Sequence, residues 1–238
     1  MLYLIGLGLN KEGFSYEAIN AIKNCRKIYL ENYTVELPYT KDEIQELIQK
    51  KIADADRNFV ESEQLIKEAK EQNVALLVYG NPLMATTHIS LIEEARKEKI
   101  QTRIIHASSV LDAVAETGLQ IYKFGKTTSI PSWKKNFEPT SFIEIIKQNQ
   151  SIDAHSLILV DVGMSLKDAL DELKKSCTKE NFKLEKIVLC SRLGTKDSKV
   201  YYDKLNNLKK KEILSPFCIV IPSKLHFLEK EILERWRD

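Results

Sequence analysis

Short apolar runs alternate with amphipathic stretches through the first half of this 238-residue chain. The runs are rich in Leu, Ile and Val, a composition typical of buried strands. We expect these strands at residues 2–9, 27–30, 74–79 and 102–106. The stretches between them carry apolar residues at helical spacing, as Ala18, Ile22 and Cys25 do. Strands that alternate with helices predict βαβ units, a mostly parallel sheet and therefore an α/β fold.

A parallel sheet binds ligands just beyond the carboxyl ends of its strands, so the loops after the predicted strands are candidate sites. The first loop begins with Gly6 and Gly8, as a nucleotide-binding loop does. However, Lys11 stands where the dinucleotide fingerprint needs its third glycine. The two glycines therefore either support a ligand or only allow a tight turn. Glu31, at the end of the second strand, is a candidate for the acid that holds a ribose.

The loop after the third strand, residues 80–88, reads Gly-Asn-Pro-Leu-Met-Ala-Thr-Thr-His. Its glycine and proline fix a turn. The hydroxyl-rich stretch is expected to open a helix whose free N–H groups favour an anionic group. Met84 offers a soft apolar surface for a purine or a thioether. The alternative is a purely structural helix start that Thr86 or Thr87 caps.

The loop after the fourth strand, residues 106–110, repeats the pattern of a strand end, small hydroxyl residues and a helix start. Two such helix starts at one sheet edge predict a cleft. His106 and Ser108 would suit a catalytic pair, but no third partner stands at a recognisable spacing, so hydrolase chemistry is disfavoured.

The second half of the chain begins with a segment that lacks the regular periodicity of the first half. Residues 118–135 mix aromatic, glycine and hydroxyl residues with little periodicity. Beyond them we expect strands at residues 156–162, 186–191 and 217–221, and helices at residues 166–175 and 225–236. This change in sequence periodicity predicts a domain boundary near residue 110. We therefore expect two α/β domains, at residues 1–110 and 111–238.

Composition narrows the class of protein. The net charge of +2 is too small to attract the chain electrostatically to nucleic acid or membranes. The four cysteines contain no C-x-x-C pair, and no His or Cys residues have metal-ligand spacing, so we expect reduced, buried thiols and no metal site. The N-terminal segment lacks signal-peptide features and no apolar run approaches the roughly 18 residues of a spanning helix. We therefore expect a cytoplasmic protein.

Five blocks along the chain, taken together, resemble the ordered signature of the diphthine synthase family within the tetrapyrrole methylase superfamily. The blocks are residues 2–9, 30–34, 80–88, 118–125 and 222–227. The block Leu-Gln-Ile-Tyr-Lys-Phe-Gly at residues 119–125 is the most specific, because related tetrapyrrole methylases share the loops but not this run. The compact length is similar to that of archaeal members.

The resemblance implies two α/β domains with a cofactor cleft between them, usually in a homodimer. It implies S-adenosylmethionine as methyl donor, released as S-adenosylhomocysteine. The substrate would be translation elongation factor 2 carrying 2-(3-amino-3-carboxypropyl)histidine. Successive methylation of that amino group gives diphthine, the archaeal product being trimethylated. The family needs no metal, membrane or nucleic acid. Matching motif positions predict donor contacts at Leu9, Asn81, Met84, Ser109, Val110, Val160, Leu193 and His226.

One position departs from the family pattern, which typically has Asp where this chain has Asn81. Asparagine keeps the size and a carbonyl acceptor but loses the charge, so the change bears on affinity for a cationic sulfonium. No residue is an obvious general base, and Glu31 and Tyr122 are the candidates. Two alternatives stay open: a small-molecule methyltransferase of the tetrapyrrole type, and a nucleotide-binding module that has lost catalysis.

Overall fold

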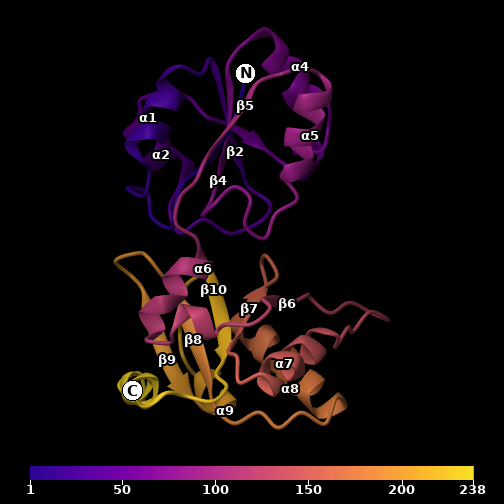
Figure 1. Ribbon diagram of the computed structural model, residues 1–238, viewed down its shortest axis with the longest axis vertical. Helices are drawn as coiled ribbons and strands as arrows, with labels where there is room; N and C mark the ends of the chain where they lie inside the picture. The colour runs from indigo at the N-terminus through magenta and orange to yellow at the C-terminus, as the bar shows by residue number, and fades with distance from the viewer. Residues whose placement is uncertain (238) are drawn as a thin grey trace. The chain divides into compact units, whose positions relative to one another are not determined.

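The computed structural model describes residues 1–237 and divides into two compact units, Met1–Leu111 and Asp112–Asp238. Both units are mixed α/β structures, each built on its own five-stranded sheet (Figure 1). The expected α/β fold class is therefore confirmed. No helix within residues 1–237 is long and apolar enough to cross a membrane.

Unit 1, Met1–Leu111, contains a fully parallel sheet of order β3-β2-β4-β1-β5. Its strands are β1 (Leu2–Gly6), β2 (Lys27–Glu31), β3 (Ala53–Ala55), β4 (Val74–Val78) and β5 (Thr102–Ile105). Its helices are α1 (Tyr16–Lys23), α2 (Lys41–Ile48), α3 (Arg57–Val60), α4 (Gln64–Glu71) and α5 (Ile89–Lys97), followed by α6 (Val110–Ala113) at the division point. The parallel sheet predicted for this half is confirmed. Sequence analysis missed the short edge strand β3 and α3.

Helices cover both faces of this sheet, as a parallel sheet requires (Figure 1). Ile22 of α1 and Ile44 of α2 pack on one face, against Ile5 and Leu77. The opposite face is covered by α4 and α5, whose buried residues include Leu65 and Leu91. Because β4 is buried on both faces, it reads as the continuous apolar run seen in the sequence.

Unit 2, Asp112–Asp238, has a mostly antiparallel sheet of order β6-β7-β10-β8-β9, in which only β6 and β7 run parallel. Its strands are β6 (Thr128–Ile130), β7 (Ser156–Val160), β8 (Ile187–Ser191), β9 (Lys199–Asp203) and β10 (Phe217–Ile221). Its helical segments are η1 (Val114–Thr117), η2 (Ile121–Lys123), α7 (Phe142–Ser151), α8 (Leu166–Lys179), α9 (Leu205–Leu208) and α10 (Phe227–Glu234). Residues from α7, α8 and α9 form the core over one face of this sheet.

Several local expectations are settled by the structure. Ser15 caps α1, because its hydroxyl accepts the N–H of Ala18 at 3.0 Å. The expected caps Thr86 and Thr87 are wrong: α5 begins at Ile89 after an N-cap at His88. The Thr86 hydroxyl instead donates to the Pro82 carbonyl at 3.0 Å. The expected thiol burial is confirmed for the four cysteines: Cys25, Cys177, Cys190 and Cys218.

Candidate functional site

Three loops of unit 1 meet where β4, β1 and β5, which are neighbours in the sheet, reach their carboxyl ends. Gly8 and Gly80 exchange two backbone hydrogen bonds of 3.2 and 3.0 Å. A Cβ on Gly6 would lie 2.7 Å from the Gly80 oxygen and 2.9 Å from the Cβ of Ala107. Close packing between the loops therefore accounts for the glycine at position 6.

The first predicted donor contact, Leu9, is held in place by Tyr79, the residue that follows β4. Its side chain is buried, and its carbonyl oxygen accepts the hydroxyl of Tyr79 at 3.2 Å. Sequence analysis gave Tyr79 no role, because it ends an apolar run and resembles a core residue. The structure shows that its polar end fixes the backbone of the first loop.

Asn81 joins the second and third loops. Its amide nitrogen lies 3.1 Å from Nδ1 of His106 and donates to the Ala107 carbonyl at 3.2 Å. Its amide oxygen accepts the N–H of Leu83 at 3.3 Å. Asn81 thus uses both ends of its amide to fix the edge formed by these loops. Among the described residues, no hydrogen bond joins His106 to Ser108.

The remaining predicted contacts of unit 1 lie on the same loops. Met84 is 40% exposed, and its N–H donates to the Asn81 carbonyl at 3.1 Å. Ser109 is buried and its hydroxyl accepts the N–H of Leu111 at 3.2 Å, while Val110 is partly buried. The structure therefore brings Leu9, Asn81, Met84, Ser109 and Val110 to one edge of one sheet. That edge presents backbone groups, an amide and a thioether, with no carboxylate among these five residues.

The interpretation of Glu31 as a ribose-binding acid gains no support. Its buried carboxylate accepts the N–H groups of Tyr33 and Thr34 at 3.2 and 2.8 Å, and the Thr34 hydroxyl at 2.7 Å. The residue therefore anchors its own loop. Burial and the neighbouring Glu31 raise the pKa of Tyr33 to about 12, so its hydroxyl stays protonated at neutral pH.

That hydroxyl links two of the signature blocks. Tyr33 Oη lies 3.4 Å from Nε2 of the buried His88, whose Nδ1 lies 3.1 Å from the Pro82 carbonyl oxygen. Because a carbonyl only accepts, Nδ1 carries the ring proton and Nε2 accepts from Tyr33. His88 is thus a structural bridge between the loop after β2 and the loop after β4.

In unit 2 the three predicted contacts lie on three separate segments. Val160 ends β7 and is partly buried. Leu193 is buried in the loop after β8, where Glu116 accepts the N–H of Gly194 at 2.9 Å and the hydroxyl of Ser198 at 2.9 Å. His226 is exposed and is the N-cap of α10, its Nδ1 accepting the N–H of Leu228 at 3.4 Å.

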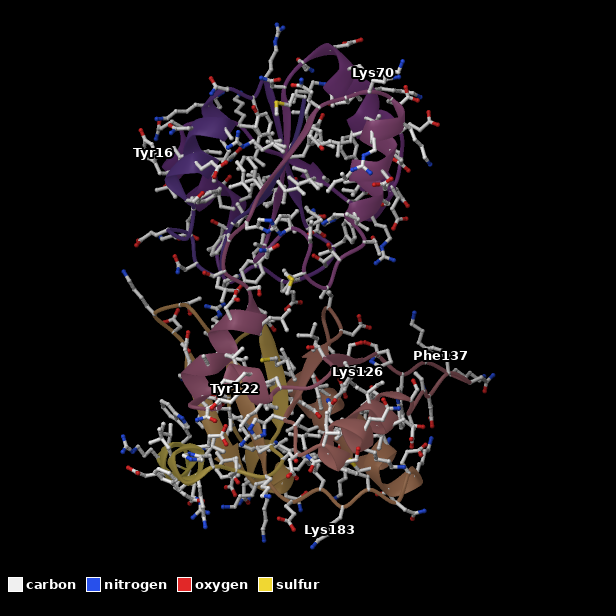
Figure 2. The ribbon with its side chains drawn as sticks, viewed as in Figure 1. Tyr16, Lys70, Tyr122, Lys126, Phe137 and Lys183 are labelled. Carbon is white, nitrogen blue, oxygen red and sulfur yellow. The ribbon has the colours of Figure 1, made fainter. Side chains whose placement is uncertain are left out.

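The block at residues 118–125 packs against residues far along the chain. Gly118 has φ of +87°, and a Cβ there would lie 2.3 Å from Ile232 Cγ2 of α10. A Cβ on Gly125 would lie 2.2 Å from Oδ1 of Asn149. Between these glycines, Tyr122 is 80% exposed and donates its hydroxyl to Gln120 at 2.6 Å (Figure 2). Both glycines are required by close packing.

A hollow of about 1040 Å³ opens in unit 2 near β9 and the end of α8, with Cys177, Tyr202 and Arg237 among its lining residues. It contains none of the predicted donor contacts. The loops described above therefore remain the candidate site.

Comparisons with known proteins decide the family. Residues 1–209 match the family model described as Tetrapyrrole (Corrin/Porphyrin) Methylases. A diphthine synthase of Methanococcus maripaludis is 38% identical, with 98% of each chain covered. This chain belongs to the tetrapyrrole methylase family, in its diphthine synthase branch. The diphthine methyl ester synthase of Schizosaccharomyces pombe is 32% identical, over 99% of this chain and 94% of that protein.

A solved structure agrees with this family assignment. A crystal structure of a diphthine synthase superposes with a TM-score of 0.91 at 34% identity, covering 100% of this chain and 96% of that one. The two-domain α/β architecture of this tetrapyrrole methylase is thus shared over its whole length. The five signature blocks identified the same branch from the sequence.

Proposed function

We propose that this chain is an S-adenosylmethionine-dependent methyltransferase. It acts on the amino group of 2-(3-amino-3-carboxypropyl)histidine in translation elongation factor 2 and forms diphthine. The observation that carries the proposal is similarity to diphthine synthases over nearly the whole of both chains. The close packing around Gly118 and Gly125 explains the two glycines of the block at residues 118–125.

Methyl-donor binding is assigned to the eight predicted contacts: Leu9, Asn81, Met84, Ser109, Val110, Val160, Leu193 and His226. The residues of unit 1 fit such a ligand. The exposed Met84 thioether suits an apolar ring, and the Asn81 amide, whose oxygen lies 3.3 Å from both Leu83 N and His106 Nδ1, stands beside it on the same loop. Buried Leu9, Ser109 and Leu193 contribute bulk or main-chain groups rather than exposed side-chain atoms.

The chemistry is an in-line attack by the amine lone pair on the sulfonium methyl carbon. A nitrogen–carbon bond forms and the carbon–sulfur bond breaks, its electron pair remaining on sulfur to give the thioether product. The first two methylations each release a nitrogen proton to water, whereas the third gives a quaternary ammonium and releases none. Since the donor is already activated, the protein accelerates the step mainly by holding the reacting atoms in line. Glu31 is not the base in this proposal, because loop donors already occupy its carboxylate.

The yeast relative supplies a second candidate, because its name specifies a methyl ester. Similarity favours amine methylation, since the archaeal diphthine synthases are 35–39% identical and the yeast protein 32%. The two products are distinguishable, because alkali releases a methyl group from an ester and not from an amine.

The test is transfer of labelled methyl groups from S-adenosylmethionine to elongation factor 2 that carries the unmethylated precursor. Alkali-stable label on that protein, and none on elongation factor 2 with plain histidine, is the expected result. Alkali-labile label would favour ester formation, and transfer only to a tetrapyrrole would favour the small-molecule alternative. No transfer to any acceptor would contradict the proposal.

The proposal includes a cytoplasmic homodimer. Five apolar residues in the last part of the sequence are candidates for a dimer surface: Leu225, Phe227, Leu228, Ile232 and Trp236. Ile232 packs against Gly118 and the Trp236 indole donates to the Thr117 carbonyl, so both serve unit 2 itself. Phe227 and Leu228 stay 76% and 44% exposed and support the proposal. Light scattering that gives twice the 27.4 kDa chain mass is the expected result, and a clean monomer contradicts it.

A further inference from the structure

One buried carboxylate in unit 2 joins three segments that lie far apart in the sequence. Glu229 of α10 is 0% exposed. Its Oε1 accepts the N–H of Gln120 at 2.9 Å and Nε2–H of His155 at 3.1 Å. Its Oε2 accepts the Lys123 ammonium at 2.5 Å and the N–H of His226 at 2.7 Å. We call Glu229 with these four partners the Glu229 clamp.

The charges within the clamp are settled by geometry. His155 Nδ1 accepts the N–H of Ser223 at 2.9 Å, so the proton of the neutral ring lies on Nε2, where it faces Glu229. Burial and then Lys123 lower the pKa of His155, although Glu229 opposes them. Burial alone would raise the pKa of Glu229, but Lys123 and the N–H donors lower it to about 2. The charged pair at neutral pH is therefore Lys123 and Glu229.

Two signature blocks meet at this carboxylate. Gln120 and Lys123 belong to residues 118–125, and His226 belongs to residues 222–227. The imidazole of His226 is exposed, and its ring lies 4.1 Å from that of Phe227. Its backbone N–H, by contrast, is fixed by Glu229 within a capping box at the start of α10. Glu229 thus fixes the His226 backbone, and the N–H of Leu228, donated to Nδ1 at 3.4 Å, fixes its imidazole at the same helix start.

We propose that Glu229 is a positioning residue, which holds His226 and the turn at residues 120–123 in the arrangement that binds the methyl donor. The inference rests on the proposed function, and in particular on His226 as a donor contact. Glutamine at position 229 has one acceptor oxygen and one NH₂ group where four donors converge, so it cannot replace the carboxylate.

The test is a double-mutant cycle on the affinity for S-adenosylhomocysteine, measured by calorimetry well below the melting temperature. Glu229→Gln should weaken binding about tenfold or more, since it removes a buried, charge-assisted anchor. His226→Ala should weaken binding several-fold. If Glu229 acts through His226, the double variant should bind no more weakly than Glu229→Gln alone. Losses that multiply in the double variant would overturn the inference.

Glu231→Gln is the matched control. Glu231 lies on the same helix but is exposed, and it pairs only with Arg235 at 2.6 Å among the described contacts. Its substitution should leave affinity unchanged. If Glu229→Gln fails to fold, Lys123→Met replaces it in the cycle. That variant removes the charged partner and keeps the three N–H donors, so the same non-additivity is expected with a smaller loss.

Amide hydrogen exchange without donor separates this inference from the proposed function. The amides of Gln120 and His226 should lose protection together in Glu229→Gln and keep it in Glu231→Gln. Unchanged protection of His226 would overturn the inference even where the wild type binds the donor. A wild-type protein that binds neither S-adenosylmethionine nor S-adenosylhomocysteine would overturn the proposed function. It would also overturn the role of Glu229 in donor binding.

Discussion

The loop edge of unit 1 and the Glu229 clamp of unit 2 hold their predicted donor contacts by different means. In unit 1 the contacts are neutral: backbone bonds between Gly8 and Gly80, the Asn81 amide and the Tyr79 hydroxyl. In unit 2 the clamp contains a charge pair whose carboxylate, Glu229, is buried and whose lysine, Lys123, is 21% exposed. Neutral networks lose about 1 kcal/mol with one bond, whereas removing a buried carboxylate that several donors share costs several times more. Unit 2 should therefore be the more sensitive to single substitutions and to acid.

The largest expected effect is on stability when the clamp is broken. Glu229→Gln takes the charged acceptor away from the donors of Gln120, His155 and His226 as well as from Lys123, and should destabilise unit 2 by about 3–5 kcal/mol. Chemical denaturation that resolves the unit 2 transition measures this loss. The exposed pair of Glu231 and Arg235 provides the scale, since Glu231→Gln should cost no more than about 0.5 kcal/mol. Equal losses of unfolding free energy from Glu229→Gln and Glu231→Gln would contradict the expected difference between the buried and the exposed glutamate.

The pH dependence of stability provides a second test of the Glu229→Gln substitution. The folded-state pKa of Glu229 is about 2, below the ordinary value of 4.5, so its stabilisation is present above pH 4.5 and is lost as pH falls toward 2. Wild-type melting temperature should drop through this window. The drop should be smaller in Glu229→Gln, which has no carboxyl to protonate.

The next largest effect should come from the glycine packing of unit 1. Gly6→Ala places a methyl group 2.7 Å from the backbone oxygen of Gly80, which cannot move without the loop. We expect a loss of about 1–3 kcal/mol and weaker donor binding. Ser108→Ala changes an exposed side chain of the third loop and serves as the control for thermal melting. A Gly6→Ala protein with wild-type stability and donor affinity would show that the loops are not closely packed.

Asn81→Asp tests whether the charge typical of the family suits this chain. A carboxylate cannot donate to the Ala107 carbonyl, which Asn81 does at 3.2 Å, so we expect a cost of about 1–2 kcal/mol in unit 1 stability. Donor affinity should not rise. Calorimetry at low and high salt checks this, with Asn32→Asp at an exposed position as the charge control. A large, salt-sensitive gain in affinity would instead show that this chain is a weakened binder.

The smallest effect is expected from Tyr79→Phe. It removes the hydroxyl that binds the Leu9 carbonyl at 3.2 Å and keeps the ring. Donor affinity should fall two- to fivefold, which corresponds to about 0.5–1 kcal/mol, with little change in melting temperature. Tyr16→Phe, at a site that is 79% exposed, should change neither quantity (Figure 2). Identical affinities for Tyr79→Phe and wild type would remove Tyr79 from the account.

The fold of unit 1 was predictable because its strands are buried on both faces and appear as apolar runs, as β4 does. Unit 2 was less predictable. Its edge strand β9 alternates buried Val200 and Tyr202 with more exposed residues and is flanked by lysines, so no apolar run marks it. The short strand β6 lies within the aperiodic segment. Antiparallel pairing of β10 with β7 and β8 depends on contacts between distant residues, which periodicity does not report.

Local sequence signals also failed to predict hydrogen bonds between polar groups that are far apart in the sequence. His155 and Glu229 are 74 residues apart, and Gln120 and Glu229 are 109 apart. The motif at the start of α10 places His at the cap and Glu three residues later. It therefore differs from the usual Ser or Thr capping box, although both capping-box bonds form. Thr86 looked like a cap because its hydroxyl precedes a helix, but that hydroxyl bonds back to Pro82. Motif resemblance indicated these segments, whereas the long-range contacts that hold them are visible only in the folded chain.

The most direct measurement is mass spectrometry of elongation factor 2 after incubation with the purified protein and S-adenosylmethionine. The peptide that bears the modified histidine should gain the mass of successive methyl groups, ending at the trimethylated amine, and fragmentation should place them on the aminocarboxypropyl nitrogen. The same peptide without that side chain should gain none. A peptide of unchanged mass, from a protein that calorimetry shows to bind S-adenosylmethionine, would contradict the account.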